Sequence, residues 1–111
     1  MADDRLEIVP GTLDLLVLRT LEAMGSLHGY GIARRIEQAG QEGLLLNEGT
    51  VYASLVRLQQ QRLITSGWGT SENGRKARFY SMTKDGKKKL AAATKNWQRT
   101  VLMVSRILES E

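Results

Sequence analysis

Three side chains between positions 50 and 57 have the types and the spacing needed to contact a base edge or a phosphate. On a helix over 48–62, Thr50, Ala53 and Arg57 lie on one side. The apolar stripe on the other side consists of Val51, Leu55 and Leu58. A threonine hydroxyl bonds phosphates or base edges, an alanine methyl fits a thymine methyl, and arginine pairs with guanine or phosphate. The pattern predicts insertion into a major groove, although an ordinary amphipathic surface helix shows the same pattern.

A cluster of cations follows at residues 75–78, within the run NGRKAR at 73–78. The flanking runs LITSGW and ARFYSMT are rich in β-branched and aromatic residues, which predicts a β-hairpin with this cluster near its tip. The run GYGIARRIEQA, which has a helical pattern ending near Gly40, and the helix over 48–62 form a predicted helix-turn-helix. Beside it, Arg75, Lys76 and Arg78 would lie along a DNA backbone or in the minor groove. The alternative is a solvated, mobile turn.

Two tyrosines and an asparagine complete the candidate DNA-contact set. Tyr52 lies at the flank of the helix face, where its hydroxyl would bond a phosphate, and a purely structural tyrosine is an equal alternative. Tyr30 begins the preceding helix, whose free N–H groups suit a phosphate. Asn47 is the predicted N-cap of the later helix. The full set is Tyr30, Asn47, Thr50, Tyr52, Ala53, Arg57, Gly74, Arg75, Lys76 and Arg78.

Charge is distributed unevenly along the 111 residues. Residues 1–56 carry four arginines against eight acids, whereas residues 57–106 carry twelve lysines and arginines against two acids. Such a basic half attracts polyanions, and we expect nucleic acid as the partner.

Other function classes find little support. The chain has no cysteine and one histidine, so no metal site or cofactor is expected, and His28 is assigned a turn or capping role. No paired carboxylates, nucleophile with a base, or phosphate-binding glycine motif indicates an enzyme. No secretion signal and no apolar run of membrane-spanning length occurs, so a cytoplasmic protein without membrane contact is expected.

The elements predict a mainly α fold with a small β-hairpin, namely a winged helix-turn-helix plus a long C-terminal dimerisation helix. Thr12 is expected to cap the first helix, 25–29 to be a turn, and Thr83 to cap the last helix, while Tyr80 and Met82 face the core. We expect a single domain over 1–111, with a DNA-binding part at 11–83 and the dimerisation helix at 84–110.

The last helix carries an apolar heptad seam that is too long for one small body to cover, which predicts a homodimer. The predicted interface consists of Leu90, Trp97, Val101, Val104, Leu108, Leu15 and Leu18. Trp97 near a two-fold axis would leave a slot for a small aromatic or hydrophobic effector. We assign Trp97, Val101 and Leu13 to it, with plain core packing as the alternative.

The runs HGYGIARRIE, LNEGTVYASLVRLQQQRLI and GRKARFYSMT resemble the PadR family of bacterial transcriptional regulators over about residues 11–108. The resemblance implies a homodimeric winged helix repressor, joined by its C-terminal helix, with Tyr52 at the DNA. It also implies a palindromic operator and release by a small molecule or stress signal. Some members bind flat hydrophobic compounds between subunits, at a tryptophan matching Trp97. Ala53 departs from the proline that many relatives have there.

We therefore expect a sequence-specific, ligand-responsive repressor of double-stranded DNA. A winged-helix protein-interaction module, whose basic face does not read DNA sequence, is the alternative. An RNA-binding module is disfavoured, because no exposed aromatics are arranged for base stacking.

Overall fold

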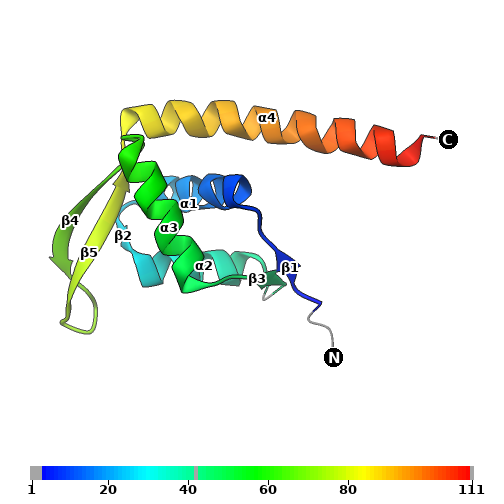
Figure 1. Ribbon diagram of the computed structural model, residues 1–111. Helices are drawn as coiled ribbons and strands as arrows, with labels where there is room; N and C mark the ends of the chain where they lie inside the picture. The colour runs from blue at the N-terminus through cyan, green and yellow to red at the C-terminus, as the bar shows by residue number, and fades with distance from the viewer. Residues whose placement is uncertain (1–3, 42, 111) are drawn as a thin grey trace.

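Capped helices and a small sheet follow one another along the chain. A computed structural model describes residues 4–41 and 43–110, and Figure 1 shows their arrangement. The helices are α1 (Pro10–Met24), α2 (Gly29–Ala39), α3 (Glu48–Gln60) and α4 (Lys84–Glu109). The strands are β1 (Leu6–Glu7), β2 (Leu27–His28), β3 (Leu44–Leu45), β4 (Ile64–Thr70) and β5 (Lys76–Met82). The predicted mainly α fold, with a winged helix-turn-helix and a long last helix, is confirmed.

Local capping explains where the helices begin. Asn47 caps α3 as predicted, because its Oδ1 accepts a hydrogen bond of 2.7 Å from the Gly49 amide. His28 caps α2, with Nδ1 accepting from the Gly31 amide at 2.9 Å, so its expected capping role is confirmed. The prediction of Thr12 as the first cap is wrong. α1 begins earlier, at Pro10, whose fixed φ suits the first helical position.

The hairpin belongs to a three-stranded antiparallel sheet with the order β2-β5-β4. Tyr80 is buried and Met82 is half-buried against the core, as predicted. The expectation that 25–29 is only a turn is wrong, since this segment contains β2, which pairs Leu27 with Tyr80. A two-residue strand is too short to leave a periodic signal in the sequence. β1 and β3 form a separate parallel pair.

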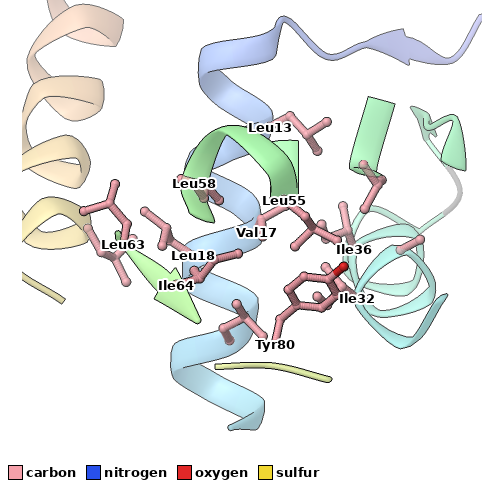
Figure 2. Packing of buried hydrophobic residues seen from close by; sticks show 14 residues of the cluster. Leu13, Val17, Leu18, Ile32, Ile36, Leu55, Leu58, Leu63, Ile64 and Tyr80 are labelled. Carbon is pink, nitrogen blue, oxygen red and sulfur yellow. The ribbon is translucent and has the colours of Figure 1, made fainter. Parts of the chain in front are cut away.

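The core lies where α1, α2, α3 and the hairpin meet (Figure 2). Val17 of α1 and Ile32 of α2 are fully buried at its centre. The predicted apolar stripe of α3 is also buried in it, which confirms the inward side of that helix. The complete cluster is Leu13, Val17, Leu18, Leu21, Ile32, Ala33, Ile36, Val51, Leu55, Leu58, Leu63, Ile64, Tyr80 and Leu90.

The last helix starts on this core and then leaves it. Thr83 caps α4 as predicted, accepting from the Gly86 amide at 3.0 Å. Gly86 is buried there, and a Cβ would overlap the carbonyl oxygen of Leu63. Beyond Leu90 the apolar side chains from Trp97 onward are exposed, and Figure 1 shows α4 extending past the N-terminal end of α1. No described helix combines the length and apolar character that a membrane span requires.

Candidate nucleic-acid interface

A groove of about 540 Å³ opens between the start of α2, the exposed side of α3 and the hairpin. Its lining includes five members of the DNA-contact set, namely Tyr30, Tyr52, Arg75, Lys76 and Arg78. The fold thus brings together side chains from three elements that are distant in the sequence. The groove is lined by three tyrosines, three cations and one acid, Glu48. Hydroxyl groups and cations are the groups that bind a phosphate backbone.

In the first half of α3, Glu48, Val51 and Tyr52 line this groove, whereas Thr50 and Ala53 do not. Thr50 and Ala53 are exposed, and Tyr52 is 62% exposed, so its ring is not a core residue. The Thr50 hydroxyl donates to the carbonyl of Asn47 at 2.7 Å, which orients it while its lone pairs remain able to accept. Gly49 and Ala53 are small, so a partner can approach the backbone of this helix closely.

Arg57 lies on the same helix but is engaged elsewhere. Its Nη2 lies 2.7 Å from Oδ1 of Asp14 on α1, and its Nε lies 3.3 Å from Oδ2. The Ser54 hydroxyl donates to the same carboxylate at 2.6 Å. The hydrogen bond to Asp14 raises the pKa of the Arg57 guanidinium and outweighs the lowering by burial. The predicted pairing of Arg57 with guanine or phosphate would therefore have to compete with this ion pair within the protomer.

The hairpin tip is a closed turn. The Ser71 amide donates to the Arg75 carbonyl at 2.8 Å, and the Gly74 amide donates to the Ser71 carbonyl at 2.9 Å. Gly74 has a φ of 75°, which favours glycine because it has no Cβ. Arg75 and Lys76 are exposed beside this turn. The turn presents these cations at a defined position rather than on an open loop.

Sequence reasoning missed Trp68 on β4, which is 63% exposed. The Nζ of Lys76 lies 5.0 Å from the centroid of its ring, and the Cζ of Arg78 lies 5.2 Å from it. The Nε of Arg78 also donates to the Ser66 hydroxyl at 3.0 Å. The strand register accounts for these contacts, since Trp68 is paired directly with Arg78 and so shares its face.

Tyr30 lies at the mouth of the groove, beside His28. The two rings are stacked, with centroids 6.3 Å apart and an interplanar angle of 21°. Tyr30 is nevertheless 63% exposed. His28 is also in edge contact with Phe79, at 5.5 Å between centroids, so capping and ring contacts occupy its side chain. Among residues 4–41 and 43–110, no three His, Asp or Glu side chains gather as metal ligands.

The residues expected at a dimer interface or an effector slot fall into two groups. Trp97, Val101, Val104 and Leu108 are exposed on α4, and Leu15 is half-buried on α1. Leu13, Leu18 and Leu90 are instead buried in the core of the protomer, with 2%, 2% and 4% of their surface exposed. Their assignment needs correction, because they have almost no surface to offer a second copy or an effector.

Several solved structures with this fold carry the name of transcriptional regulators. A structure of a transcriptional regulator from Clostridium thermocellum superposes with a TM-score of 0.80 at 25% identity, covering 89% of this chain and 95% of that one. A PadR-like transcriptional regulator from Bacillus cereus gives a TM-score of 0.74 at 25% identity, covering 91% and 95%. A protein of Lysinibacillus sphaericus named uncharacterized protein X is 28% identical over 105 residues, 95% of each chain.

The family model of the transcriptional regulator PadR-like family matches residues 17–92, more than half of the chain. The match covers part of α1, all of α2 and α3, the hairpin and the start of α4, so it includes every element that lines the groove. This chain therefore belongs to the PadR-like family of transcriptional regulators.

Proposed function

We propose that the protein is a repressor that binds a palindromic operator in double-stranded DNA as a homodimer. The observation that carries the proposal is the groove lined by Tyr52 of α3 and by the hairpin cations, together with the exposure of Thr50 and Ala53 on the same helix. In this arrangement α3 enters the major groove with Thr50 and Ala53 toward the bases. Arg75, Lys76 and Arg78 lie against the backbone and set the position of the helix.

The far half of α4 supports the homodimer. Its exposed apolar side chains include Trp97, Val101, Val104 and Leu108, each between 44% and 78% exposed. A second copy related by a two-fold axis would cover them, together with Leu15 of α1. We treat 1–111 as one domain, with 11–83 binding DNA and 84–110 joining the subunits. Two copies of α3 about 34–36 Å apart would then fit successive major grooves.

An effector bound at this dimer interface would change the separation of the two copies of α3. Trp97 and Val101 would meet their symmetry mates, and a flat aromatic or hydrophobic compound stacked between them would shift the dimer away from the spacing DNA requires. Titration of a planar cationic dye should quench tryptophan fluorescence in the unaltered protein. Failure to quench, or equal dye affinity for Trp97→Ala, would remove the effector slot but leave DNA binding standing.

A mobility shift on the DNA upstream of the protein's own gene tests DNA binding itself. The expected result is a complex that survives excess unrelated duplex, with two protomers per duplex by sedimentation. The Thr50→Asp variant serves as the matched negative control, because it adds charge on an exposed position without touching the core. A protein-interaction module would show equal competition by every duplex, and that outcome would contradict the proposed repressor.

A further inference from the structure

Trp68 lies on the face of the hairpin that turns toward α3. Residues two apart on a strand share a face, so Arg78 and Tyr80 of β5 point the same way, and Trp68 of β4 pairs with Arg78. Tyr80 is buried in the core at the base of this face, and Arg78 lines the groove together with Tyr52. Trp68 therefore lies on the groove side of the hairpin, beyond the point where Tyr80 enters the core.

The ring is held in place although it is exposed. Lys76 and Arg78 both lie over it, within 5.0 Å and 5.2 Å of its centroid, and Arg78 is fixed further by its hydrogen bond to Ser66. Contacts of this kind order both partners, because the ring attracts the cations electrostatically. The result is an aromatic ring with two positive charges over it, and 63% of Trp68 remains in water.

We propose that Trp68 is a DNA-contact residue whose ring packs against the deoxyribose wall of the duplex while Lys76 and Arg78 pair with the adjoining phosphates. This inference rests on the proposed function. A DNA backbone alternates apolar sugars with anionic phosphates, which matches the order of ring and cations on this face. The contact is independent of base sequence, so it adds affinity for every duplex and positions the hairpin rather than selecting the operator.

Fluorine NMR of the full chain labelled with 5-fluorotryptophan tests the contact directly. The protein has two tryptophans, and Trp68→Phe identifies which resonance belongs to Trp68. The probe is a short mixed-sequence duplex at low salt, spanning two major grooves about one helical turn apart. On saturation, the Trp68 resonance should shift, and its H2O-to-D2O isotope shift should shrink as solvent is excluded. A resonance and isotope shift that stay unchanged in the bound state would overturn the inference.

The DNA affinities of substituted proteins test how much the Trp68 ring contributes to binding. Trp68→Ala should weaken binding to all duplexes by a similar factor of about three to ten, and Trp68→Phe should retain most of the affinity. Thr65→Ala, exposed on the other face of the same strand, is the matched control and should change nothing. Unchanged affinity in Trp68→Ala overturns this inference alone. If the unaltered protein binds no duplex at low salt, the proposed function fails and this inference fails with it.

Discussion

Asp14 on α1 holds Arg57 on α3 through an ion pair of 2.7 Å that also engages the hydroxyl of Ser54. The pair joins the helix that borders the groove to the helix that packs beside α4. Charge-assisted hydrogen bonds of this geometry are directional, so they fix the rotation of α3 about its own axis. The side chains that α3 presents outward, including Thr50 and Ala53, depend on that rotation.

Loss of the Asp14 carboxylate charge should reduce the stability of the fold. Asp14→Asn should lower the free energy of unfolding by about 1–2 kcal/mol, because Arg57 loses its partner charge and only one of the two acceptor oxygens remains for Arg57 and Ser54. Glu22→Gln is the control, since its 2.6 Å pair with Arg19 lies on the surface and should be worth less than about 0.5 kcal/mol. Urea unfolding measures both variants. Equal effects would contradict a special role for the Asp14 pair.

The same pair predicts how Arg57 affects DNA binding. Arg57→Ala should weaken binding to all sequences by a similar factor, because it loosens α3 as a whole and removes no base contact. The affinities of the unaltered protein and of Arg57→Ala for an operator, and for duplexes with single base changes, distinguish a positioning role of Arg57 from a base contact. A loss of preference at one base pair would instead show that the guanidinium leaves Asp14 to reach a base.

The hairpin cations should carry the salt dependence. Arg75→Ala and Lys76→Ala should each weaken binding to every duplex and reduce the slope of log affinity against log salt by about one unit. Lys95→Ala removes an equal charge from the exposed surface of α4, away from the groove, and should leave the slope unchanged. A slope that is insensitive to Arg75 and Lys76 would place the DNA elsewhere.

The start of α4 should not tolerate a side chain at Gly86. Gly86→Ala should destabilise the protein by about 1–3 kcal/mol, because its Cβ would overlap the backbone of Leu63. Gly11→Ala in α1 meets open space and should change stability by less than about 1 kcal/mol, in the stabilising direction. Thermal unfolding compares the stabilities of the two variants. Unchanged stability of Gly86→Ala would show that the start of α4 does not pack against Leu63 as described.

Tyr80 should make stability fall at alkaline pH. Burial raises the pKa of its hydroxyl above the ordinary value of 10.0, although the charge of Arg78 lowers it in part. Below pH 10 the group is neutral in both states and its contribution is fully present. As pH rises through the unfolded and then the folded pKa, the unfolded chain ionises first and stability is lost. In the Tyr80→Phe variant, the free energy of unfolding should fall less between pH values below and above about 10 than it does in the unaltered protein. Urea unfolding measures this, and the same pH profile in both proteins would contradict the prediction.

Features decided by neighbours in the chain could be predicted from sequence. The caps Asn47 and Thr83 act on amides two or three residues away, and the heptad spacing of α4 reflects one continuous helix. The clustering of Tyr30, Tyr52 and the hairpin cations followed from the order of the elements, because a helix-turn-helix followed by a hairpin brings these residues to one face.

Features decided by distant partners could not be predicted in this way. Asp14 lies 43 residues before Arg57, and a helical projection of α3 does not show what approaches its side. Leu18 lies off the main stripe of α1 and was expected at the dimer interface, yet elements of the same protomer bury it. Trp68 was overlooked because its role depends on which hairpin face turns toward α3, and this follows from the burial of Tyr80.

Selection of bound sequences from a random pool of duplexes by the full-length protein tests the central claim most directly. A dimer with α3 in successive major grooves predicts enrichment of a palindrome with half-sites about one helical turn apart. The Thr50→Asp variant should enrich nothing under the same conditions. Recovery of a pool without any shared motif by the unaltered protein would contradict the claim that α3 reads DNA sequence.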